Sequence, residues 1–260
     1  YGKENTAVGY QSLLSNTSGS SSTAIGFQAM MNANDFANTN TSFETFNTAI
    51  GYQSLMGSST PSANTGKYNT ATGYQSLKNI TTGSHNTAIG YQALTLNTSG
   101  VNNTAIGSFT LSNNTTGSHN TAIGRSILAN NSSGIGNVAI GYSTLNSNVT
   151  GNYNTAIGYG ADVRLSNLTN ATAIGNGAIV NASNTIKLGN ASIDSVVTAG
   201  KLKLGTIIYP NTDGTNGQIL TTNGSGVLAW SNPASLNDTA TTLRAKILLD
   251  SNVLATNINT

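Results

Sequence analysis

Branched aliphatic residues recur at a nearly constant interval over residues 1–190 of the chain. They belong to a repeated phrase, Asn-Thr-Ala-Ile-Gly, whose glycines follow one another at a constant step of seventeen, except for two longer steps on either side of Gly51. Within the phrase, Thr and Ile are separated by one residue and point to one side of a strand, whereas Ala and Gly point to the other. The repeated glycines are Gly9, Gly26, Gly51, Gly73, Gly90, Gly107, Gly124, Gly141, Gly158 and Gly175.

Each repeat unit predicts a strand, a turn, a shorter strand and a second turn, which is one coil of a parallel β-solenoid. Gly, Asn, Thr and Ser fill the unit and disfavour helices. We therefore predict an all-β chain with a solenoid over residues 1–190. The expected stacked interior consists of isoleucines and of leucines five positions later: Ile50, Ile89, Ile106, Ile123, Ile140, Ile157, Leu55, Leu94, Leu111, Leu128 and Leu145.

A single coil of this kind has a thin interior. Roughly two or three large apolar side chains, each worth about 1.5–3 kcal/mol when buried, face an ordering cost of about 1–2 kcal/mol per residue. Stacked coils pair their backbone groups, and the bare Ala and Gly side would let another chain approach closely. We therefore predict that three solenoids pack around an axis as a homotrimer, although this arithmetic requires only some partner.

Residues 191–260 depart from the repeat and predict a small β-rich stem. An alternating run before Pro210 predicts a strand that ends at this proline. Residues 218–222 and 227–231 flank the sequence Asn-Gly-Ser-Gly, which predicts a hairpin. Apolar residues within 239–255 fit either a short helix or a chain-exchanging strand.

Composition narrows the class of protein. Charged residues make up 7% of the chain, against about a quarter in ordinary domains. Ten Lys and Arg against eight Asp and Glu, with no basic run, exclude a nucleic-acid binder driven by phosphate neutralisation. No apolar stretch approaches the roughly 20 residues of a membrane span. The chain starts in mid-repeat, so we expect it to be part of a longer polypeptide or fibre.

Catalytic and metal-binding residues are sparse. No carboxylate lies between Glu44 and Asp162, and a glycosidase needs two facing carboxylates, which only Asp35 and Glu44 could supply. We predict no enzymatic activity, no cofactor and no metal. His85 and His119 fit exposed turns, and an ion site around a trimer axis is the alternative.

The two long steps of the repeat predict loops that leave the coil, which in solenoids often form the binding face. The first loop supplies the predicted ligand-binding residues, and self-packing of its rings is the alternative interpretation. A separate aromatic column directly after the motif glycines is interpreted as a packing ladder, and stacking of its rings on sugars is the alternative. The predicted ligand-binding residues are Asp35, Phe36, Phe43, Glu44 and Phe46.

The units NTAIGYQAL and ATAIGNGAIVNASNTIKLGN resemble the head repeats of trimeric autotransporter adhesins, whose motif is approximately N-S-V-A-I-G-x-x-S. The resemblance covers about residues 1–190 and implies a left-handed parallel β-roll assembled as a homotrimer at the cell surface. Longer-period versions of the motif resemble phage tail-fibre shafts. The seventeen-step period of this chain differs from the period of the adhesin heads.

These observations favour a non-enzymatic extracellular fibre segment that acts as a stiff spacer and attaches to a surface glycan or protein receptor. A cell-surface adhesin, a secreted filament and a phage tail fibre share this fold. An ice-binding solenoid is the rival from another class, because a flat Thr ladder could organise water. That rival requires Thr to face solvent, whereas we expect Thr to lie inside with Ile.

Overall fold

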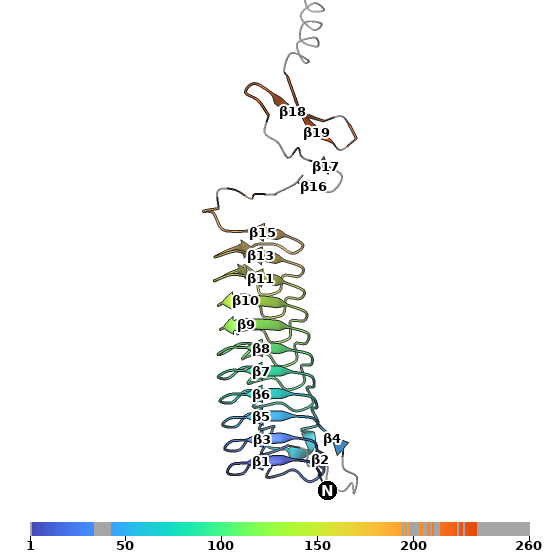
Figure 1. Cartoon of the computed structure of the whole chain (residues 1–260), viewed down its shortest axis with the longest axis vertical. Helices are drawn as coiled ribbons and strands as arrows, with labels where there is room; N and C mark the ends of the chain where they lie inside the picture. The colour runs from blue at the N-terminus through green and yellow to red at the C-terminus, as the bar shows by residue number, and fades with distance from the viewer. Residues whose placement is uncertain are drawn as a thin grey trace, which may run out of the picture. The chain divides into compact units, whose positions relative to one another are not determined.

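A computed structural model describes residues 2–33, 43–193, 195, 197, 203–204, 207–208, 210, 214–222, 224–225 and 227–232. The chain forms two units, Tyr1–Ile193 and Asp194–Thr260, and each is described by itself. The first unit is a parallel β-solenoid (Figure 1), which confirms the predicted coil. Its described residues contain no α-helix, only the short 3-10 turn η1 (Pro61–Ala63).

The solenoid is organised around one sheet of eleven parallel strands, one from each successive coil. Neighbouring strands pair in register, so that Ile89 lies opposite Ile106 and Ile106 opposite Ile123. Each position of the repeat therefore forms a straight column along the solenoid. The strands are β1 (Thr6–Val8), β3 (Thr23–Ile25), β5 (Thr48–Ile50), β6 (Thr70–Thr72), β7 (Thr87–Ile89), β8 (Thr104–Ile106), β9 (Thr121–Arg125), β10 (Val138–Tyr142), β11 (Thr155–Ile157), β13 (Thr172–Ile174) and β15 (Ile186–Leu188).

A second strand is present in only some coils, in contrast to the prediction. In the described solenoid, β2 (Gly19–Ser20) pairs with β4 (Phe43–Glu44), and β12 (Asp162–Val163) pairs with β14 (Ile179–Val180). Elsewhere the chain turns through left-handed residues such as Leu94, with φ of 52°. Such a conformation is costly for leucine, but the Leu94 N–H donates to the next coil at 3.0 Å, so packing between coils fixes it.

The predicted isoleucine interior is wrong. Alanine occupies the inner side of the strand and isoleucine the outer side: Ala88 is fully buried, whereas the Ile89 side chain is 39% exposed. A coil of this size already contains leucine and asparagine, so only the smallest side chain of the strand fits inside. The displaced isoleucines are Ile50, Ile89, Ile106, Ile123, Ile140 and Ile157. The predicted leucines are buried: Leu55, Leu94, Leu111, Leu128 and Leu145.

Asparagine side chains form a continuous hydrogen-bonded ladder inside the solenoid. The Asn120 Nδ2 donates to the Asn103 Oδ1 at 3.1 Å and to the Gly134 carbonyl at 2.9 Å. The Asn120 Oδ1 accepts hydrogen bonds from the backbone N–H of Asn137 at 2.9 Å and from its Nδ2 at 3.1 Å. Each amide thus satisfies buried polar groups in its own coil and in both neighbours, as the amide-ladder interpretation expects.

A second interior ladder runs beside the first. The Asn131 Nδ2 donates to the Asn114 Oδ1 at 2.8 Å and to the Gly134 carbonyl at 3.2 Å. The Gly134 carbonyl therefore accepts one amide from each ladder. This pairing holds the two sides of the coil together. The members of the second ladder are Asn97, Asn114, Asn131 and Asn148.

Glycine after the isoleucine is required where successive coils approach most closely. At Gly90 the backbone φ is 137°, and an added Cβ would lie 2.6 Å from the carbonyl oxygen of Gly107 in the next coil. Any side chain at this position would therefore separate the stacked coils.

The second unit contains two antiparallel pairs among its described residues. β16 (Lys203–Leu204) pairs with β17 (Ile207–Ile208), and β18 (Ile219–Thr222) pairs with β19 (Leu228–Ser231). The second pair confirms the predicted hairpin. The helix or exchanged strand predicted within 239–255 lies outside the described residues.

The amide ladder yields a stability prediction. Asn120→Ala removes a buried amide and leaves partners in three coils unsatisfied, so we expect a loss of about 2–4 kcal/mol in the free energy of unfolding, measured by urea denaturation. Asn113→Ala is the control, because Asn113 is exposed and should change stability by less than about 0.5 kcal/mol. Equal losses for the two variants would contradict the structural role of the ladder.

Candidate interaction surfaces

The outer side of the eleven-stranded sheet carries a column composed mostly of threonine beside a column composed mostly of isoleucine. The exceptions are Val138 and Ile186 in the first column and Val8, Thr72 and Leu188 in the second. We call these two columns the threonine-isoleucine face. Apart from the exposed Thr6 of β1, its threonines are half-buried between coils, and Ile123 and Ile140 are 39% and 38% exposed. No outward residue at these two positions is charged in the described strands. The face is therefore a long, mostly apolar strip, of a kind that marks interaction sites in soluble proteins.

The threonine hydroxyl groups on this face differ in their hydrogen bonding from threonine hydroxyl groups elsewhere in the coil. Among the described residues, no hydrogen bond involves the hydroxyls of Thr104 and Thr121. In contrast, the Thr98 and Thr115 hydroxyls, outside the sheet, donate to backbone carbonyls of the next coil at 3.1 and 3.0 Å. The prediction that threonine points into the coil is therefore wrong. Since threonine lies on the outer side of the sheet, it could face solvent, as an ice-binding face requires.

Aromatic rings stack along one edge of the sheet. The aromatic edge consists of the residues directly after the motif glycines: Tyr10, Phe27, Tyr52, Tyr74, Tyr91, Ser108, Arg125, Tyr142, Tyr159 and Asn176. The rings of Tyr52, Tyr74 and Tyr91 stack with centroids 5.0 Å apart and planes within 6° of parallel. Because the rings cover one another, this column is a packing ladder, as interpreted from the sequence.

A glutamine ladder accompanies the aromatic edge in the first five coils. The Gln53 Nε2 donates to the Gln28 Oε1 at 2.8 Å, and the Gln75 Nε2 donates to the Gln53 Oε1 at 2.9 Å. The ladder starts at Gln11 and ends at Gln92. The glutamine ladder thus lies in the N-terminal half of the solenoid, whereas rings of the aromatic edge also stack further along, at Tyr142 and Tyr159.

The pattern changes in the sixth and seventh coils. Ser108 replaces tyrosine, and the ring moves to the neighbouring residue, Phe109, which meets Tyr91 edge-on at 5.1 Å and 67°. In the next coil, the guanidinium carbon of Arg125 lies 5.7 Å from the ring centroid of Tyr142. Arg125 is exposed. Sequence reasoning did not single out Arg125, although its charge in an otherwise neutral column is visible in the repeat alignment.

The structure does not gather the predicted ligand-binding residues into one site. Asp35 and Phe36 lie outside the described residues, and for Phe43 the structure describes only its place in β4. Glu44 is exposed. Phe46 is 42% exposed and stacks on a residue of the following coil. These residues therefore remain a prediction, with Phe46 engaged in packing.

Phe46 begins a second aromatic column at a corner of the coil. It stacks on Tyr68 at 5.2 Å, and Tyr68 stacks on the ring of His85 at 4.7 Å. Further along the same column, the Nε2 of His119 lies 3.2 Å from the Nδ2 of Asn102. Both histidines are exposed, in agreement with the predicted turn.

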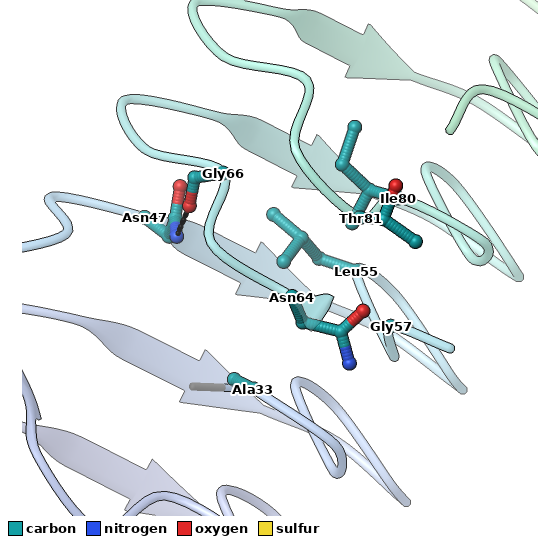
Figure 2. Close-up of a pocket in the computed structure, with 8 residues that line it drawn as sticks. All are labelled: Ala33, Asn47, Leu55, Gly57, Asn64, Gly66, Ile80 and Thr81. Carbon is teal, nitrogen blue, oxygen red and sulfur yellow. Dashed lines mark hydrogen bonds between the residues drawn. The ribbon is translucent and has the colours of Figure 1, made fainter. Parts of the chain in front are cut away.

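The second inserted segment folds over the coil and leaves only a small cavity. Asn64, directly after η1, donates through Nδ2 to the carbonyls of Asn32 at 2.7 Å and Ser58 at 3.0 Å. The cavity has a volume of about 10 Å³, enough for one water molecule at most and far below a ligand pocket. Figure 2 shows its lining: Ala33, Asn47, Leu55, Gly57, Asn64, Gly66, Ile80 and Thr81.

Among the described carboxylates, Asp162 has an environment that shifts its pKa. Burial raises its pKa above the ordinary value, and hydrogen bonds from Val163 and Ser147 oppose this shift. Its carboxylate accepts the backbone N–H of Val163 at 2.8 Å and the Ser147 hydroxyl at 2.9 Å. These bonds cap backbone groups at a corner of the coil. In the part of the chain that the structure describes, no group of three or more His, Cys, Asp or Glu could hold a metal ion.

No protein-family model matches the chain, and no curated protein matches it significantly. Within the described ranges, no helix is long and apolar enough to cross a lipid bilayer.

The environment of Asp162 predicts that the free energy of unfolding depends on pH. Because its pKa is raised in the folded state, the folded chain binds more protons, and stability falls as pH rises from the ordinary pKa through the raised one. Asp162→Asn keeps an oxygen acceptor but does not titrate. The variant should therefore gain stability relative to wild type over this acidic window, measured by urea unfolding between about pH 3 and 7. A difference that stays constant with pH would contradict the burial argument.

Proposed function

We propose that this chain is a non-enzymatic segment of an extracellular fibre, in which the solenoid is a stiff spacer and an attachment surface. The observation that carries this proposal is the uncovered isoleucine column of the threonine-isoleucine face. Long apolar strips are rare on monomeric proteins, because their exposure favours association. The same face on further copies of the chain is a suitable cover.

The proposed assembly is a homotrimer of left-handed solenoids, as the resemblance to adhesin heads implies. The bare Ala and Gly side cannot serve as the interface, because alanine is inside the coil. Ile50 and Ile140 are 40% and 38% exposed, so covering each such side chain would contribute about 0.6–1.2 kcal/mol. Summed over the coils, this stabilises an assembly without any charged contact.

The spacer role rests on the interior ladders. Neighbouring coils are fixed to each other by backbone hydrogen bonds and, along most of the solenoid, by buried amides such as those of Asn103 and Asn120. At about 4.8 Å between neighbouring strands, the eleven stacked strands of the sheet make a rod roughly 50 Å long. Bending such a rod would break several of these bonds in one place.

Attachment to a surface glycan or protein receptor completes the proposal. A trimer presents each surface feature three times, so a modest site gains avidity. A cell-surface adhesin, a secreted filament and a phage tail-fibre shaft are the candidate host structures, and all three share this solenoid. The protein would then act outside the cell, at a cell surface or on a virion.

The proposed interface can be tested by substitution. Wild-type chains of 26.5 kDa should sediment as a species of three chains. Ile123→Glu places a charge on the threonine-isoleucine face and should shift the population toward monomer, because a buried unpaired carboxylate is costly. Leu96→Glu is the matched control, because Leu96 is 41% exposed but lies outside the sheet. A monomeric wild type, or equal effects of both substitutions, would refute the assembly.

An ice-binding solenoid is the second candidate function. The observation that favours it is the outward column of threonines whose hydroxyls have no hydrogen-bond partner among the described residues, at positions such as Thr104 and Thr121. β-branched side chains hold one orientation and present methyl and hydroxyl groups at the spacing of the strands. An uncovered face of this kind could organise water.

A thermal-hysteresis assay distinguishes this function from assembly. If the face is uncovered in solution, the wild-type chain should show hysteresis, and Thr121→Tyr should abolish it by disrupting the flat column. Thr116→Tyr serves as control, because Thr116 is exposed but lies outside the sheet. Absence of hysteresis in the wild type would remove ice binding.

A further inference from the structure

Arg125 is the single charged residue of the aromatic edge, as this edge is defined above. Its side chain is exposed and forms no ion pair within the described residues. Other described carboxylates of the solenoid are few, namely Glu4, Glu44 and Asp162, and Asp162 is held by Ser147. A second copy of the chain is therefore a poor source of a counter-charge for Arg125.

The guanidinium of Arg125 has an aromatic neighbour on one side. On that side lies Tyr142, 5.7 Å from the guanidinium carbon, and Tyr142 is itself stacked on Tyr159 at 5.1 Å. In the preceding coil the equivalent position is Ser108, because β8 and β9 pair in register. The neighbour is thus a small hydroxyl residue where other coils have a ring.

We propose that Arg125, positioned by the ring of Tyr142, and the neighbouring Ser108 bind a sugar residue that carries a carboxylate. A guanidinium offers a planar fork of donors that matches a carboxylate in two parallel hydrogen bonds. Its cation-π contact with Tyr142 reduces the freedom lost on binding. The Ser108 hydroxyl can bond a sugar hydroxyl.

This inference rests on the attachment role proposed above and names its ligand class. The aromatic edge follows the motif glycine, at the end of the strand, so it borders the threonine-isoleucine face rather than forming its centre. We expect a carboxylated glycan to reach Arg125 from this border when that face is covered. A trimer would present the site three times, which suits weak binding of a polymeric glycan.

Calorimetric titration with acidic and neutral sugar pairs tests the site on the full chain. The probes are sialyllactose against lactose, and trigalacturonate against its methyl ester. Wild type should bind at least one acidic probe and neither neutral partner. Arg125→Gln should weaken this binding at least tenfold, and Ser108→Tyr, which restores the ring of other coils, should block it. Arg164→Gln is the control, because Arg164 is an exposed arginine elsewhere in the solenoid.

Several results would overturn the inference: no binding of either acidic probe, equal binding of the neutral partners, or unchanged binding by Arg125→Gln. Saturation by acetate alone at the same affinity would reduce the site to a simple anion site and equally overturn it. Sedimentation of the same samples separates the two proposals. A trimer that binds no acidic sugar refutes only the sugar site, and a monomer that binds one refutes only the assembly.

Discussion

The buried asparagine amide is the interaction on which this solenoid depends. A narrow coil turns backbone carbonyls inward, away from water, and each must find a donor. The amides of Asn120 and Asn131 both reach the Gly134 carbonyl, and each continues to the next coil. An amide both donates and accepts, so asparagine repeated at one position from Asn47 to Asn154 satisfies its neighbours in successive coils. Without it, the coil would enclose unpaired polar groups.

The surface chemistry follows from how this interior is filled. Once asparagine, leucine and alanine occupy the coil, the isoleucine of the strand has no place inside and forms a column on the outer side. The register that aligns the amides also aligns the outward residues. A residue type that is repeated at one position of the coil therefore forms a column along the rod. A residue that differs from the others in its column, such as Arg125 among aromatic rings, then occurs at one place on an otherwise regular surface.

The sequence predicts the period, the register and the buried leucines, because these depend only on spacing. It does not predict which side of the strand faces inward. Alternation shows that Thr104 shares a side with Ile106, but the usual preference of isoleucine for the interior is overruled by the width of the coil. Left-handed leucines such as Leu94 have no local signal, because contacts between coils impose them. The trimer and the loop residues Asp35 and Phe36 remain predictions.

The second amide ladder also bears on how the chain can be modified. Asn97, Asn114, Asn131 and Asn148 each begin an Asn-x-Ser or Asn-x-Thr triplet, the acceptor motif for N-linked glycans. Their side-chain nitrogens are buried and donate hydrogen bonds within the coil. A sugar attached at any of them would have to occupy the centre of the rod. The folded solenoid therefore conceals acceptor motifs that its primary structure displays.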